Sequence, residues 1–479
     1  MFRTISDTIH DDRDYPSRRR KINILARVLE LTFYDELQYS FHTERNDSTG
    51  EYIPLRLRRP SVKYGLCRTV VDDAVGLLFS EGHFPGIKTG NETETDTIKS
   101  IIKSVNLNEV LIDAATVGSV GSVAIKLSII EGSLFLKAHC TEYLTPTFSP
   151  KSPKELILLA EQYKVKGHEL KEAGYAIADD DLNTKFWMRR EWDLNNETWF
   201  NPVKVGETLN FSKDKKRSVN HALGFVPWVW VRNLPGGDDV DGRCTFIDAI
   251  DTGIEIDYLL SQGGRGLKYA SDPTLLIKEP AVGAGGELVR GGGNAIVVEA
   301  NGDAKMLEIN GTASQAVIEY VKFLRELAIE SIHGNRMGAD KISAAQSGRA
   351  LEIINQPLIN LADKLRISYG EGALVTIIKM IISASQKYEI IVDGAKIKNL
   401  TSKTVTLIWP SWYAPSPDES MSKATAINTA VTGGFLSTEA AATAIAADYD
   451  IEDIPAELVK ISADKQQRIK DQPQPKVII

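Results

Sequence analysis

Cysteine is scarce in this sequence of 479 residues, which contains only Cys67, Cys140 and Cys244. An odd number of cysteines, spread far apart with no close pair, indicates neither a disulfide framework nor a zinc knuckle. Small secreted disulfide scaffolds are thereby excluded, and we expect a reducing compartment.

Long apolar runs are missing as well. The stretch Ala373–Ala384 is interrupted by Lys379 and falls short of the roughly 20 residues that a bilayer-spanning helix needs. Near the N-terminus, Asp11, Asp12 and Arg13 stand where a signal peptide would have its apolar core. We therefore predict no membrane span and no secretion signal.

The motifs of common catalytic centres are also absent. A phosphate-binding loop requires a Gly-Lys pair, which the sequence does not contain, and the nearest imitation, Gly118–Gly121, is predicted to be a tight turn. No GxSxG elbow occurs, and the histidines show no HExxH spacing. We predict no enzyme activity, no metal and no cofactor.

Two glycine-rich segments imitate ligand sites. Pro235–Gly242 alternates Asp239 and Asp241 before a glycine but lacks the closing glutamate of a calcium loop, so a solvated turn is favoured over a calcium site. The run Gly291–Gly293 does not follow the strand-then-helix pattern of an anion-binding loop. Its glycines are predicted to form turns.

Charge of neither sign dominates. The 64 acidic and 56 basic residues give a net charge of -8, the wrong sign for a protein that grips DNA phosphates. A wall along which DNA must slide is compatible with this balance, and ordinary solubility explains it equally. The basic cluster Arg18–Arg20 and the looser set Arg56, Arg58 and Arg59 are predicted to lie on a solvated face, with contact to nucleic acid or an acidic partner as the alternative.

What is present is a globular composition, with 43% hydrophobic and 25% charged residues in a chain long enough for several packed regions. Apolar residues at helical spacing predict helices over 21–41, 61–79 and 95–118. A hairpin is predicted over 122–138, and antiparallel-sheet sequence fills 153–231.

The second half alternates helices with one β-rich insertion. Helices are predicted over 246–268, capped by Thr245, and over 313–333, with a β-rich module at 273–308 between them. A polar loop at 335–346 precedes an apolar helix that reaches Ser385, and Pro357 should kink this helix near Asn355. A strand at 404–409 leads into C-terminal helices, with a break at Gly433 and Gly434 and a restart at Ser437.

The order of these elements resembles the portal proteins of tailed bacteriophages, particularly the siphophage type. The text HALGFVPWVWVRN followed by CTFIDAIDTGIEIDYLLSQ is similar to that family's strand into its first stem helix, and Ser347, Gly348, Ala350 and Leu351 reproduce its SGxAL text. Upstream, RTVVDDAVGLLFSEG is similar to its wing helix, and GGFLSTEAAATAIA resembles its crown.

The resemblance implies an α+β phage portal fold in which a tunnel loop precedes a long kinked helix. The implied regions are a wing (1–243), a first stem helix (244–271), a clip (272–311), a second stem helix (312–333), a tunnel loop (334–346), the kinked helix (347–385), a wing return strand (386–415), a crown (416–470) and a flexible tail (471–479).

The resemblance also implies a function, that of a dodecameric ring at one capsid vertex of the virion, assembled in the host bacterial cytoplasm. Double-stranded DNA would be packaged and ejected through it without sequence recognition. The implied partners are further copies of the chain, the large terminase, the major capsid and scaffolding proteins and a head-tail connector or adaptor protein, with no membrane.

The residues that the resemblance singles out fall into three groups. They are the DNA-facing tunnel loop Asn335, Arg336, Met337, Gly338, Ala339, Asp340, Lys341, Ile342 and Ser343, the kink at Pro357, and the clip residues Lys278, Glu279, Glu287 and Arg290. The alternatives are another virion structural protein, such as a capsid or connector subunit, and a nucleic-acid-processing enzyme. The module inserted between two long helices argues against the first, and the missing motifs argue against the second.

Overall fold

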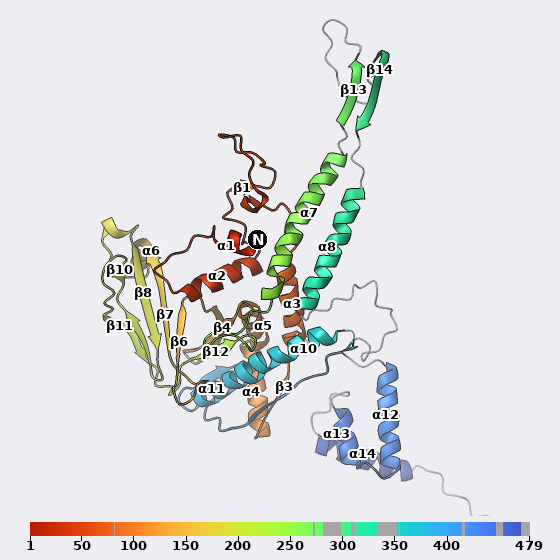
Figure 1. Ribbon diagram of the computed structural model, residues 1–479. Coiled ribbons are helices and arrows are strands. Elements are labelled where there is room, and N and C mark those ends of the chain that lie inside the picture. Colours follow the sequence, from red (N-terminus) through yellow and green to blue (C-terminus); the bar gives the residue numbers. More distant parts are fainter. Residues whose placement is uncertain are drawn as a thin grey trace, which may run out of the picture. The chain divides into compact units, whose positions relative to one another are not determined.

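The computed structural model describes residues 1–80, 82–271, 274–280, 298–307, 312–332, 352–353, 355–413, 417–446 and 454–470. The chain divides into two compact units. The first consists of Met1–Arg336 and Gln356–Pro410, and the second of Met337–Asn355 and Ser411–Ile479. The architecture mixes helices with mainly antiparallel strands, which agrees with the predicted α+β class (Figure 1).

The N-terminal part of the first unit is helical. Its helices are α1 (Phe2–Ser6), α2 (Ser17–Leu29), α3 (Leu66–Phe79), α4 (Glu92–Ser104) and α5 (Leu107–Gly118). The helices predicted over 61–79 and 95–118 are confirmed, the second as two helices. The helix predicted over 21–41 is too long at its C-terminal end, because Leu31 has a φ of 60° and the chain leaves the helix there. Phe33, Leu37 and Phe41 are nevertheless buried, so their spacing reflects burial without a helix.

Two antiparallel sheets follow. The predicted hairpin is confirmed as β4 (Ser122–Ile130) and β5 (Ser133–Cys140), and β12 (Trp228–Arg232) pairs with the other side of β4. Between the strands of the hairpin, Glu131 and Gly132 both have positive φ, as a tight two-residue hairpin turn requires. The larger sheet contains β6 (Leu144–Phe148), β7 (Leu156–Lys166), β8 (Lys185–Trp192), β9 (Asn196–Phe200), β10 (Val203–Lys204) and β11 (Lys213–Asn220).

Short elements complete this unit. They are β1 (Tyr39–Ser40), η1 (Leu55–Leu57), β2 (Arg58–Arg59), β3 (Gly86–Thr89), α6 (Gly167–Glu172), η2 (Asp179–Asp181), η3 (Ile247–Ala249), β15 (Ile390–Val392), β16 (Ala395–Ile397) and β17 (Val405–Ile408). The strand predicted over 404–409 is confirmed as β17, which pairs with β3 from more than 300 residues earlier in the chain.

The basic cluster on α2 is a structural element, so its assignment to a solvated face is wrong. The Arg18 guanidinium donates to both carboxylate oxygens of Asp241, at 2.6 and 2.7 Å, and to the backbone oxygens of Thr141 and Leu144. Arg19 forms an ion pair with Glu142 at 3.0 Å. These contacts connect α2 to the segment Thr141–Leu144, which joins β5 to β6, and to Asp241.

The looser basic set shows the same error at one position. Arg58 is only 2% exposed and donates to the backbone oxygen of Phe41 and to the Tyr52 hydroxyl. Asp241 is likewise 3% exposed, so the segment Pro235–Gly242 is not simply a solvated turn. Charged residues in a sequence thus do not identify a solvated face when each finds a buried partner.

A long helical segment crosses the first unit as α10 (Gln356–Leu365), the π-helix η5 (Arg366–Leu374) and α11 (Val375–Ser385). Pro357 is the second residue of α10, where a missing N–H costs little. The kink predicted near Asn355 lies at the boundary of the described residues and stays a prediction. The π-helix was not predicted. It contains Tyr369, which is fully buried, and Gly370, where a Cβ atom would lie 2.4 Å from the Trp409 ring.

The segment Gln356–Ser385 is long and apolar enough to cross a membrane by length and composition. In its most apolar window, 56% is buried inside the protein, as in a core helix. The absence of a membrane span therefore stays a prediction.

The second unit is helical where it is described. It contains α12 (Pro417–Thr432), α13 (Thr438–Ala446) and α14 (Ile454–Lys470). The predicted break is confirmed, since Gly434 has a φ of 74°, and so is the restart, because Ser437 Oγ accepts a hydrogen bond from the Ala440 N–H at 3.1 Å. The predicted flexible tail lies outside the described residues.

The Arg18 contacts lead to a first prediction. Replacing Arg18 with methionine leaves the buried Asp241 carboxylate without its cation, so the free energy of unfolding should fall by about 3–5 kcal/mol. Lys21→Met, an exposed position on the same helix, is the control and should change stability by less than about 0.5 kcal/mol. Chemical denaturation followed by circular dichroism measures both, and equal stabilities of the two variants would show that the pair is not an anchor.

Candidate functional site

The two predicted stem helices and the predicted clip between them correspond to one feature, which we call the helical arm. It consists of α7 (Ile250–Ser271), β13 (Thr274–Pro280), β14 (Val298–Leu307) and α8 (Thr312–Ser331). Both long helices and the β-rich module between them are thus confirmed. The two helices lie side by side, and the strand pair follows at the end where α7 stops and α8 starts (Figure 1).

The helices of the arm pack closely because α7 carries glycine at the contact. A Cβ atom on Gly263 would lie 3.1 Å from Val317 Cγ1 of α8, so a larger residue would require Val317 to shift. At the opposite end of α8, Ala328, Ile329 and Ile332 are buried, and α8 contacts η3, which directly precedes α7. The pair is therefore antiparallel, with its base in the body of the first unit.

The strand pair at the tip is antiparallel and nearly in register. Thr274 lies opposite Leu307 and Lys278 opposite Asp303, with an irregularity between Lys278 and Pro280. Of the predicted clip residues, Lys278 and Glu279 are therefore on β13. Glu287 and Arg290 lie outside the described residues.

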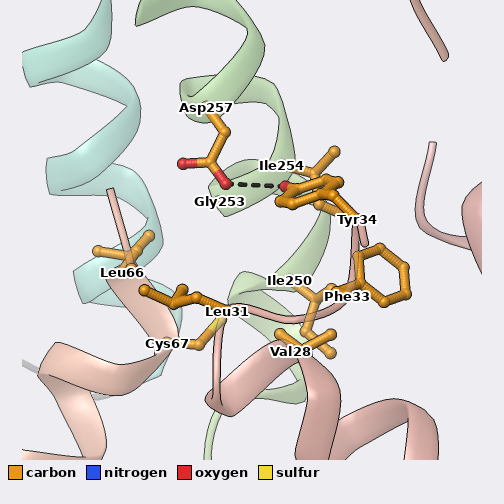
Figure 2. Close-up of a pocket in the computed structure, with 11 residues that line it drawn as sticks. Val28, Leu31, Phe33, Tyr34, Leu66, Cys67, Ile250, Gly253, Ile254 and Asp257 are labelled. Atoms are coloured by element: carbon orange, nitrogen blue, oxygen red, sulfur yellow. Dashed lines mark hydrogen bonds between the residues drawn. The ribbon is translucent and has the colours of Figure 1, made fainter. Parts of the chain in front are cut away.

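The base of the arm is held by a carboxylate buried on α7. Asp257 accepts hydrogen bonds from the Tyr34 hydroxyl at 2.8 Å and from the Tyr64 backbone N–H at 2.7 Å. Figure 2 shows the first of these bonds above the apolar side chains of α2, α3 and α7. The acid is 5% exposed, and this burial raises its pKa above the ordinary aspartate value.

A small cavity adjoins this carboxylate. It measures about 30 Å³ and is lined mainly by apolar side chains, among them Val28, Phe33 and Ile254. This is space for a water molecule or two and not for an organic ligand. Burial also raises the pKa of Tyr34, and the negative charge of the Asp257 carboxylate, which the hydroxyl faces, raises it further. Both groups are suited to anchoring, and neither is arranged for proton transfer to a substrate.

We call Asp257 and its two donors the anchor of the arm. Further polar contacts along α7 extend it. Ser261 Oγ accepts from the Val62 backbone N–H at 3.0 Å, and the Tyr258 hydroxyl donates to the backbone oxygen of Arg58 at 2.8 Å. The predicted cap at Thr245 is wrong, because α7 begins only at Ile250 and the Thr245 hydroxyl instead accepts from Asn233 Nδ2. The arm is thus tied to the segment Val62–Tyr64 over more than one helical turn.

On α8, large apolar side chains remain exposed on a side that α7 does not cover. Tyr320 is 49%, Phe323 53% and Leu327 44% exposed. Their spacing of three and four residues places them on one face of the helix. We call these three residues the α8 stripe. Monomeric proteins rarely leave such a row of large side chains in water, which makes the α8 stripe a candidate docking surface.

The other predicted functional residues are not brought together by the described structure. All nine tunnel-loop residues, 335–343, lie outside it. Among the described residues, no group of three or more histidine, cysteine, aspartate or glutamate side chains could hold a metal ion. The Gly118–Gly121 segment is the predicted tight turn, in which the Gly121 N–H donates to the Gly118 oxygen at 2.8 Å.

Sequence reasoning missed both the anchor and the stripe. Asp257 stands in the same helical stripe as Ile250, Ile254 and Ser261, and an acid within an apolar stripe was the available signal of a buried, partnered carboxylate. The stripe was hidden because α8 has apolar residues around much of its circumference, and only the packing on α7 shows which of them are left over.

Comparisons with known proteins give little information about this chain. No protein-family model matches it, and no curated protein matches it. Among solved structures, the chain matches one described as the neck of an empty GTA particle computed with C6 symmetry, at a TM-score of 0.39 and 12% sequence identity. The match covers 79% of this chain and 88% of that one. The function proposed below does not depend on this similarity.

The anchor predicts the effect of removing one hydroxyl. Tyr34→Phe leaves the buried Asp257 carboxylate with one donor fewer, so the free energy of unfolding should fall by about 2 kcal/mol at neutral pH. Tyr64→Phe is the matched control, because Tyr64 contacts Asp257 through its backbone N–H and not its hydroxyl. Urea denaturation of both variants measures the difference. Equal stabilities would show that the Tyr34 hydroxyl contributes nothing.

The raised pKa of Asp257 predicts a pH dependence. Between its unfolded-state and folded-state pKa values the folded protein binds the proton more tightly, so this group adds stability as pH falls and loses it as pH rises through the folded pKa. Asp257→Asn removes the titration. The stability of the wild-type protein relative to this variant should therefore increase as pH is lowered from neutral towards the ordinary aspartate pKa. Denaturation of both proteins across this range measures it, and a constant difference would contradict the assignment.

Proposed function

We propose that this protein is a structural subunit of a tailed-phage virion, and specifically a portal subunit that forms a ring around a DNA channel. The observation that carries the proposal is the α8 stripe on the helical arm. One side of α8 packs on α7, and a second, apolar side has no cover within the described first unit. Packing against a neighbouring copy in a closed ring would cover this second side.

The energetics favour many copies over one pair. Each residue of the α8 stripe is about half exposed, so burying the remainder contributes about 1 kcal/mol per side chain. One such contact is too weak to hold two copies together, because association itself costs several kcal/mol. In a ring every copy has two neighbours, and closure adds contacts without a further loss of freedom.

The charge on the arm suits a wall that DNA passes. Glu319, Glu326 and Glu330 of α8 alternate with Lys322 and Arg325. A mixed surface of this kind neither repels a duplex strongly nor holds its phosphates. Passage of double-stranded DNA without sequence recognition is therefore compatible with these residues.

The finer assignments belong to the same proposal. The ring would contain twelve copies at one capsid vertex, with residues 335–343 facing the DNA. The strand pair β13–β14, with Lys278 and Glu279, would face the terminase during packaging and the head-tail connector afterwards. The sequence resemblance supports these assignments, and the position of the strand pair at the tip of the arm supports the last of them.

Disrupting the α8 stripe tests the proposal. Purified wild-type protein should form rings with a central channel in electron microscopy, and Phe323→Ser combined with Leu327→Ser should shift it to monomers in light scattering, since the apolar contact between copies is lost. Val219→Ser, at a position of β11 that is 57% exposed, is the control and should keep the rings. Wild-type protein that forms no rings would argue against a portal. If the doubly substituted protein still forms rings, the α8 stripe is not the contact between copies.

A further inference from the structure

A second unsatisfied surface lies elsewhere in the first unit, along the free edge of β12. Among the strands that the structure describes, β12 is the end strand of its sheet and pairs only with β4. A groove of about 980 Å³ runs beside it and is lined by all five of its residues, Trp228–Arg232. Successive residues of a strand point their side chains to opposite faces, so a groove lined by every residue of β12 follows the strand edge.

The hydrogen-bond pattern shows which backbone groups face the groove. The Leu127 N–H donates to the Pro227 oxygen, and the Asn233 N–H donates to the Gly121 oxygen, both at 2.9 Å. In an antiparallel ladder such bonded pairs alternate, so Val229 and Val231 also point their backbone groups at β4. Trp230 and Arg232 therefore point theirs away from β4.

These outward groups have no partner among the described residues. The Trp228 N–H donates to the Val226 oxygen at 2.7 Å. The backbone N–H groups of Trp230 and Arg232 donate no hydrogen bond within the described chain. A strand edge with such a row of free groups is a template for another strand unless something covers it.

A helical segment runs alongside without closing the edge. The Ser368 hydroxyl donates to the Asn233 oxygen at 2.6 Å, and Lys387 Nζ donates to the Ala222 oxygen. The segment η5–α11 thus runs antiparallel to β12 along its whole length. The groove lies between them, with Ser368, Gly372, Thr376 and Met380 as its helical wall.

The ends and the far wall of the groove are also built. Trp230 Nε1 donates to the Val240 oxygen at 2.8 Å, which holds the loop 234–242 at one end. Phe148, the last residue of β6, and Leu156, the first residue of β7, add apolar surface to the lining. The charged residues of the lining are of both signs, with Lys154, Arg232 and Lys379 against Glu155, Asp238, Asp239 and Glu371, and a further acid, Asp241, is paired with Arg18. An occupant of low net charge with apolar side chains fits this lining.

From this geometry we propose that the β12 groove binds an extended segment of a partner polypeptide, which adds to the sheet as a further strand. The backbone of the segment bonds to the outward groups of Trp230 and Arg232, and its alternate side chains contact the helical wall and the β6–β7 turn. Five residues of strand span about 17 Å, so the segment needs at least that many residues in extended conformation and no proline where it donates to β12. This interaction is separate from the α8 stripe and does not depend on the proposed function.

The test uses a pair of variants at one position of the full chain. Arg232→Pro removes the outward N–H but leaves the bonds of Val229 and Val231 to β4, and proline is tolerated on the open side of an edge strand. Arg232→Ala removes the same side chain and keeps the N–H. The probe is a blocked seven-residue peptide that alternates valine and threonine between a terminal lysine and a terminal glutamate, and tryptophan fluorescence and titration calorimetry report its binding.

We expect the wild-type protein and Arg232→Ala to bind the probe with similar affinity, and Arg232→Pro to bind it about tenfold more weakly, the effect of one hydrogen bond. A melting temperature of Arg232→Pro close to that of Arg232→Ala checks that the fold is intact. If it is not, probes methylated at the backbone nitrogens of either the valines or the threonines test the same point on the wild-type protein. Only the isomer that lacks the donors facing β12 should lose binding.

Three results would overturn the proposal. The first is that the probe does not bind to the wild-type protein. The second is that both variants bind the probe equally and the wild-type protein binds both methylated probes equally. The third is that Arg232→Pro alters the oligomeric state while the probe does not bind. The last result would identify a second copy of this chain as the occupant of the edge.

Discussion

The helical arm depends on a carboxylate that the protein places in its interior. Asp257 lies in the middle of the apolar stripe of α7, where an unpartnered charge would be very costly, and it is kept there by the Tyr34 hydroxyl and the Tyr64 N–H. These donors lie 223 and 193 residues earlier in the chain, and their directions are fixed. The bonds therefore set both the axial position and the rotation of α7, and α8 takes its position from α7 through the contact at Gly263.

The same device recurs where α2 meets the sheets. The Arg18 guanidinium reaches Asp241, Thr141 and Leu144 together, which joins three segments at one planar group. Apolar contacts alone would allow neighbouring packings of similar energy, whereas a buried ion pair tolerates only the arrangement that satisfies every donor. In both places, buried polar groups select one arrangement among elements that hydrophobic burial brings together.

Within the described part of the first unit, the α8 stripe and the β12 edge both remain without a partner. The α8 stripe offers apolar side chains without cover, and the β12 edge offers backbone donors without acceptors. The two call for different partners, since the stripe suits a helix or another apolar face and the edge suits only an extended chain. A structural subunit that must hold neighbours of more than one kind requires this separation.

The sequence by itself determined most of the long elements and their order. Apolar periodicity and local turn residues placed α3, α7, α8, the β4–β5 hairpin and the break at Gly434 within a few residues, because these features depend on neighbours in the chain. It did not determine that Arg18 and Asp241 are buried partners, that α2 ends at Leu29, or which apolar residues of α8 stay exposed. Nor could it show that β12 lies at the end of its sheet, since the strand reads the same whether one edge is paired or both. Each of these outcomes depends on groups far apart in the sequence, and only the tertiary structure decides which of them meet.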